Sequence, residues 1–68
     1  MNEETFNLSL RKFLKTVGVS SQREIEQAVA AAISDGRIRG NETLPARVTL
    51  VIAGLKLEVG FDADIQLE

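Results

Sequence analysis

The sequence predicts an α+β domain in which two N-terminal helices pack on a C-terminal antiparallel β-hairpin. Two observations predict this class. Residues 55–68 alternate between apolar residues and polar residues or glycine at every position, which is typical of a strand with one buried face. Residues 3–35 instead carry apolar side chains at spacings of three and four, the periodicity of amphipathic helices. The chain is therefore expected to form one small domain.

The first helix is predicted over residues 3–17. Asn2 is a suitable N-cap, and Glu3 and Glu4 fall in the first turn, where the helix dipole favours acidic side chains. Gly18 is expected to end the helix, because glycine readily adopts the positive φ of a C′ residue. One stripe carries the apolar residues of this helix, namely Phe6, Leu10, Phe13, Leu14 and Val17.

The second helix is predicted over residues 21–35. Ser21 and Glu24 have the spacing of a capping box, and Gly36 is its expected C′ residue. Its apolar stripe is rich in alanine, which would let another element approach closely. The stripe consists of Ile25, Ala28, Val29, Ala32 and Ile33.

The hairpin strands are predicted at residues 46–52 and at residues 55–61 or longer, joined by a two-residue turn at Ala53 and Gly54. Proline cannot donate to a sheet ladder, so pairing is expected to begin at Ala46, after Pro45. The resulting register places one set of apolar residues on one face, with Ile52 opposite Leu55, Leu50 opposite Leu57 and Val48 opposite Val59.

The end of the last strand, residues 62–68, extends beyond its predicted partner. We expect it to pair with a second copy of the chain, making a homodimer. The candidate self-association surface is Ala63, Ile65 and Leu67, with Val51 as an apolar residue on the outer face. The alternative is a short third strand at residues 37–39, which a bend at Gly60 would bring beside the tail.

Composition argues against an enzyme. The sequence contains no His, Cys, Tyr or Trp, which removes the commonest general base, the thiol nucleophile and the soft metal ligands. Asp62 and Asp64 share a strand face, but solvated acids that keep an exposed strand soluble explain them better than a metal site. We therefore expect no catalytic residue, cofactor or metal, and a role in protein interaction or assembly.

Nucleic-acid binding is the alternative function. A helix followed by a hairpin resembles the recognition helix and wing of winged-helix DNA-binding domains. The net charge is −2, however, and the second helix carries little positive charge to engage phosphates. The candidate contacts under this alternative are Arg11, Lys12, Lys15, Arg37, Arg39 and Arg47.

No apolar run approaches the 18 residues or so of a membrane span. The polar start lacks the features of a signal peptide, so a cytoplasmic location is expected. Residues 1–18, followed by residues 19–29, resemble a family of short bacterial proteins of unknown function, and the resemblance continues through Asp35, Gly36 and the closing strand. It implies a bacterial origin and a self-contained domain, and it supplies no activity and no site residues.

Overall fold

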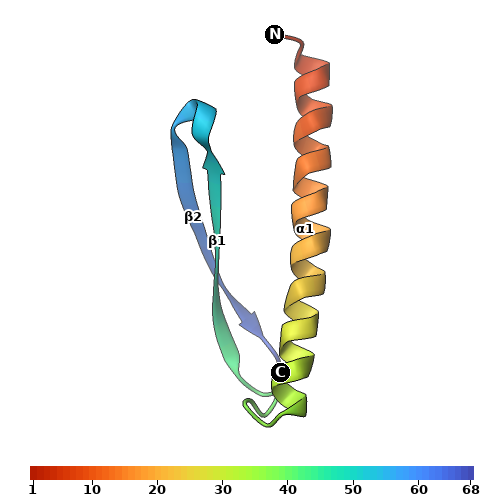
Figure 1. Cartoon of the computed structure of the whole chain (residues 1–68), viewed down its shortest axis with the longest axis vertical. Coiled ribbons are helices and arrows are strands. Elements are labelled where there is room, and N and C mark those ends of the chain that lie inside the picture. The colour runs from red at the N-terminus through yellow and green to blue at the C-terminus, as the bar shows by residue number, and fades with distance from the viewer. The chain divides into compact units, whose positions relative to one another are not determined.

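The computed structural model describes all 68 residues, which divide into two compact units, Met1–Arg37 and Ile38–Glu68. The first unit is a single helix, α1, and the second is an antiparallel hairpin of two strands, β1 and β2 (Figure 1). The predicted α+β class is confirmed. The prediction of two helices is wrong, because one helix spans both predicted segments.

Helix α1 (Glu3–Ser34) begins where the sequence predicts. Asn2 is the N-cap, and its side-chain oxygen accepts a hydrogen bond from the backbone N–H of Thr5 at 3.1 Å. The carbonyl of Asn2 accepts the first backbone bond of the helix, from Phe6 at 3.0 Å. Glu3 and Glu4 lie in the first turn, where their charge complements the exposed N–H groups.

The helix does not end at Gly18, and it does not restart at Ser21. Gly18 has no positive φ, and the residues between the two predicted helices are helical. A glycine inside a helix costs about 1 kcal/mol relative to alanine. A break would also remove the backbone hydrogen bonds that cross residues 18–21, leaving those donors and acceptors without partners in the helix. One unbroken line of positions crosses the expected break, at Leu10, Leu14, Val17, Ser21, Ile25, Ala28 and Ala32.

The C-terminus of α1 has the geometry predicted for Gly36. This residue has a φ of +79°, and its N–H donates to the carbonyl of Ile33 at 3.2 Å. The N–H of Arg37 donates to the carbonyl of Ala32 at 2.9 Å. These two bonds form a Schellman motif, which satisfies carbonyls that the end of a helix would otherwise leave free.

Residues 37–39 do not form the predicted third strand. The Arg37 guanidinium binds the carboxylate of Asp35 at 2.8 Å. The carboxylate of Glu42 accepts the backbone N–H groups of Arg39, Gly40 and Asn41 at 2.8, 2.9 and 3.2 Å. These donors are therefore occupied in a turn, and Gly40, with a φ of +107°, supplies its unusual backbone conformation.

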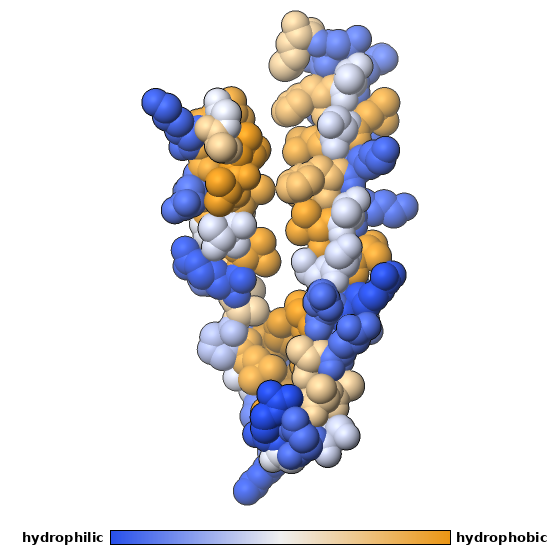
Figure 2. All heavy atoms as spheres, in the orientation of Figure 1, coloured by the Kyte–Doolittle hydropathy of each residue, from blue (hydrophilic) through white to orange (hydrophobic).

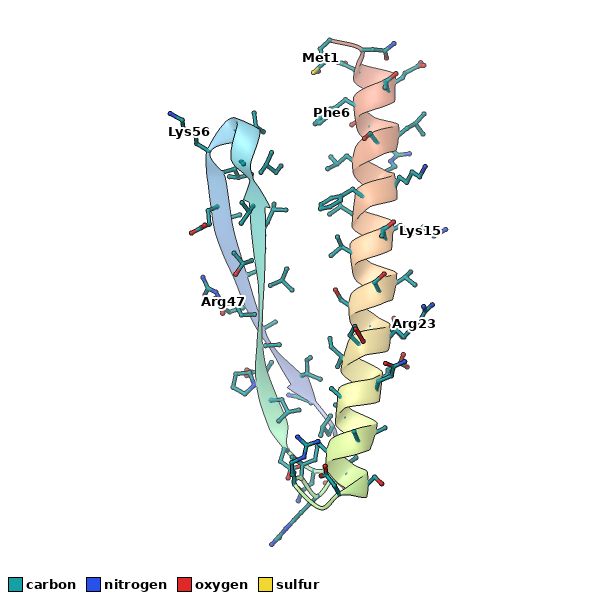
Figure 3. The ribbon with its side chains drawn as sticks, viewed as in Figure 1. Met1, Phe6, Lys15, Arg23, Arg47 and Lys56 are labelled. Atoms are coloured by element: carbon teal, nitrogen blue, oxygen red, sulfur yellow. The ribbon has the colours of Figure 1, made fainter.

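The hairpin pairs β1 (Thr43–Ile52) with β2 (Leu57–Gln66) over ten residues each. The turn has four residues and not the predicted two. It consists of the 3₁₀ segment η1 (Ala53–Leu55) and Lys56, which has a left-handed φ of 51° and lies at the tip of the hairpin (Figure 3). Ile52 therefore lies opposite Leu57 and not opposite Leu55. The register differs from the predicted one by two residues, so the side chains that pair in the hairpin stay on their predicted faces. Leu55 is the exception, because it lies in η1 and not in the strand where the sequence placed it.

Strand β1 begins at Thr43 and not at Ala46, so it pairs with the whole end of β2. Residues 62–66 lie opposite residues 43–47, and the N–H of Leu67 donates to the carbonyl of Glu42 at 3.1 Å. The prediction that this tail lacks a partner within the chain is wrong. In antiparallel strands, pairs that share hydrogen bonds alternate with pairs that do not. Glu42 shares a bond with Leu67, so Pro45, three residues later, belongs to a pair that does not, and its nitrogen faces the outer edge of β1. Its missing N–H therefore removes no bond from the ladder.

Neither unit contains a buried side chain, since every residue is exposed or half-buried. An isolated two-stranded hairpin is only marginally stable in water, and most helices in proteins are stabilised by packing of an apolar face. Figure 2 shows apolar residues gathered along one side of each unit. Each of these two apolar surfaces would be stabilised by packing against another apolar surface.

Candidate interaction surface

One face of the hairpin is entirely apolar. Because side chains alternate along a strand, every second cross-strand pair points to the same side of the sheet. Five such pairs follow one another without a polar residue among them. We call this surface the apolar face, and it consists of Leu44/Ile65, Ala46/Ala63, Val48/Phe61, Leu50/Val59 and Ile52/Leu57.

The apolar face is not flat. Phe61 is its most exposed large side chain, at 59 %, and its cross-strand neighbour Val48 is 48 % exposed. The next pair along the hairpin is Ala46 with Ala63, the two smallest side chains on the face. A projection at Phe61 therefore stands directly beside a shallow notch at the two alanines.

Three of the four residues predicted for self-association share this surface. Ala63 and Ile65 belong to the apolar face. Leu67 continues the same alternation one step beyond β2, where its N–H bonds to Glu42. Val51 lies opposite Glu58 on the other side of the sheet, so the structure separates it from the other three.

The opposite face of the hairpin is largely polar, and its centre is an ion pair. Arg47 lies directly opposite Asp62, and one guanidinium nitrogen donates to both carboxylate oxygens at 2.9 and 3.1 Å. Both side chains are well exposed, so the pair adds little to stability. It does occupy one of the two carboxylates that the sequence offered as cation ligands. No group of three or more potential metal ligands occurs in the structure.

Helix α1 carries its own apolar stripe. Phe6 projects from one side of the helix, and Lys15 and Arg23 project from the other (Figure 3). The exposed side chains of the N-terminal half include Phe6, Leu10, Phe13 and Leu14. A shallow depression on the same helix is lined by Glu4, Asn7, Leu8 and Arg11, and one helix alone cannot enclose a ligand there.

The residues predicted for nucleic-acid contact are divided between the two units. Arg11, Lys12 and Lys15 lie on α1, while Arg39 and Arg47 belong to the hairpin unit. Two of the six cations already have acidic partners, because Arg37 pairs with Asp35 and Arg47 pairs with Asp62. Within either unit, few cations remain to neutralise phosphates.

The apolar face begins two residues before the predicted strand, at Leu44. Leu44 lies before the predicted strand, which begins at Ala46 because Pro45 cannot donate to the ladder, and Ala46 is not among the three predicted apolar pairs. The signal was nevertheless present: Leu44, Ala46, Val48, Leu50 and Ile52 alternate without interruption. A proline on the outer edge of a strand is compatible with that pattern.

Comparison with known proteins identifies the family and no function. Helix α1 has no stretch apolar enough to cross a membrane. No curated protein and no solved structure matches the chain significantly. A family model does match, over residues 1–68, and the chain therefore belongs to the family of unknown function DUF6494.

Proposed function

We propose that the chain is a small protein-interaction module without catalytic activity, and that the apolar face is its binding surface. The observation that carries this proposal is the set of five consecutive apolar pairs, none of which is buried. Contiguous exposed apolar surface is uncommon on monomeric proteins and often marks a site of protein association. The opposite face of the hairpin is largely polar and can remain in contact with water when the apolar face is bound.

The absence of catalysis is part of the proposal and rests on residue chemistry. The chain has no histidine or cysteine, and its acidic and basic side chains are not held in an enclosed site. A general acid or base usually needs burial or a close charged neighbour to bring its pKa near neutral pH. Glu42 has a shifted pKa, but the shift is downward, which favours the ionised form.

A bacterial, cytoplasmic setting also belongs to the proposal. Small secreted domains usually depend on disulfides, and this sequence has no cysteine. The bacterial origin rests on the resemblance of the sequence to short bacterial proteins.

Two matched variants test the binding surface. Val48 lies on the apolar face and Val51 on the polar face of the same strand, and they are 48 % and 57 % exposed. The tagged wild-type chain, Val48→Asp and Val51→Asp are each used to capture proteins from a bacterial extract. We expect a bound protein to be lost with Val48→Asp and kept with Val51→Asp. Equal capture by both folded variants would overturn the apolar face as the binding surface.

The nucleic-acid alternative has less support. A winged helix needs three helices, whereas this chain has one. A titration of the chain with random-sequence duplex DNA at low salt tests it directly. Phosphate contacts would produce binding that falls steeply as salt is added, and the interaction module predicts no such binding.

A further inference from the structure

We propose that the apolar face binds the same face of a second copy of the chain, related by a two-fold axis. This inference rests on the proposed function and names its partner. The surface has no charged side chain that would select a partner of opposite charge. Its shape, however, is complementary to itself.

The notch and the projection are adjacent rows of the apolar face. Ala46/Ala63 forms the notch, and Val48/Phe61, the middle of the five pairs, forms the projection. Leu67 extends the face by one residue beyond Leu44/Ile65, next to Glu42, whose carboxylate binds the backbone of residues 39–41. We call the point midway between the notch and the projection the midpoint.

A two-fold axis between two stacked faces can run across the strands at this midpoint. Such an axis reverses the order of the rows and keeps each β2 over the other β2. Phe61 of each copy then lies over Ala63 of the other, and the row Leu50/Val59 lies over the row Leu44/Ile65. An axis along the strands would instead place alanines on alanines and Phe61 on Val48. The first arrangement fills the notch twice, so close packing favours it.

The area reaches the lower limit for a specific dimer. Complete burial of the ten apolar side chains, five of them exposed and five half-buried, at about 60 Å² each would give roughly 600 Å² per copy and 1,200 Å² for the pair. This total lies at the lower end of the range for stable interfaces, about 1,200–2,000 Å².

Pairing through the strand edges, which the sequence suggested, has less support than pairing through the faces. The polar side chains of β2 include Glu58, Asp62 and Asp64, which two antiparallel copies of β2 would bring close together. The outer edge of β1 lacks a donor at Pro45. Both features are common means of preventing edge association.

The test exchanges the projection and the notch. Phe61→Ala leaves a cavity opposite Ala63, and Ala63→Phe places two phenylalanines against each other. In a mixture of the two variants, each new residue meets its complement in the other chain. We expect the wild-type chain to sediment as a dimer at tens of micromolar and each single variant to dimerise at least tenfold more weakly. The equimolar mixture, and the double variant in one chain, should recover the dimer.

Val51→Ala is the matched control, since this equally exposed apolar residue lies on the other face and should leave the dimer unchanged. Far-UV circular dichroism verifies that each variant is folded, and Phe61→Leu replaces Phe61→Ala if the latter unfolds. A folded wild-type chain that is monomeric at 100 µM would overturn self-association, while the capture experiment would still decide the interaction module. A wild-type dimer whose single variants are not rescued by mixing would overturn this arrangement.

Discussion

The guanidinium of Arg47 lies over Gly60, in the space that a β-carbon on Gly60 would occupy. The two residues are diagonal neighbours on the polar face, since Arg47 lies opposite Asp62 and Gly60 lies opposite Thr49. The sequence suggested a bend at Gly60, but β2 continues through it without interruption. Glycine at this position instead lets the arginine side chain lie against the strand while its guanidinium binds Asp62.

The effect of Gly60→Ala on the free energy of unfolding is therefore expected to depend on which residue occupies position 47. Alanine is favoured over glycine within a strand by about 0.5–1 kcal/mol. In the wild-type chain this gain is reduced, because the new methyl group displaces the Arg47 side chain. In an Arg47→Ala background the full gain should appear. Urea denaturation of the four chains measures the coupling, and equal effects of Gly60→Ala in both backgrounds would contradict the contact.

Alanine at Gly18 and alanine at Gly36 are expected to change the free energy of unfolding in opposite directions. Gly18→Ala should raise the free energy of unfolding by about 0.5–1 kcal/mol, because Gly18 is inside α1 and a β-carbon there meets no atom within 4 Å. Gly36→Ala should lower it by about 1 kcal/mol, because Gly36 has a φ of +79°. Thermal denaturation by circular dichroism measures both. A destabilising Gly18→Ala would mean that the helix ends there, as the sequence suggested.

The two ends of the helical region could be predicted from sequence, and its continuity could not. Asn2 and Gly36 act locally, through hydrogen bonds and backbone conformation that neighbouring residues determine. Gly18 and Ser21 are equally clear local indications of a helix end and a helix start. Whether the helix breaks there depends on the free energy that a break would cost. The apolar positions on both sides of Gly18 lie on one continuous line, and only the polar Ser21 interrupts it.

The face of each hairpin residue could be predicted, whereas the register could not. Alternation has a period of two, so a register shifted by two residues satisfies it equally well. The turn decides between them, and its conformation depends on Lys56 adopting a left-handed φ, which is unusual for a residue other than glycine. For the same reason Ala63 and Ile65 lie on their predicted face, while the pairing of residues 62–66 with β1 was missed.

Glu42 should make the stability of the chain depend on pH. Hydrogen bonds from the backbone N–H groups of Arg39 and Gly40, with a smaller one from Asn41, hold the pKa of Glu42 below its ordinary value of 4.5. The unfolded chain therefore binds this proton more readily than the folded chain. The stability that Glu42 contributes is present above about pH 4.5 and is lost as the pH falls through the lowered pKa.

Urea denaturation of the wild-type chain and of Glu42→Gln between pH 7 and pH 3 measures this contribution. We expect the wild-type chain to be the more stable at pH 7, and the difference to shrink below pH 4.5. The other carboxyl groups titrate in both chains, so the difference isolates Glu42. A difference that stays constant over this range would show that the ionised carboxylate is not what holds the turn.

The register can be tested with introduced cysteines, because the chain has none of its own. Val51 lies opposite Glu58. Glu42 and Leu67 form a hydrogen-bonded pair, and the two kinds of pair alternate along the strands, so Val51 and Glu58 form a pair without mutual hydrogen bonds. Side chains approach most closely in pairs of this kind. The double variant Val51→Cys/Glu58→Cys should therefore form a disulfide readily in air. Thr49→Cys/Glu58→Cys, the pair that the two-residue turn would place opposite each other, should remain reduced, because diagonal positions are about 7–8 Å apart. Both pairs lie on the polar face and leave the apolar face intact.

Non-reducing mass spectrometry after alkylation of free thiols measures the oxidised fraction of each double variant. Preferential oxidation of the pair at residues 49 and 58 would support the shorter, two-residue turn.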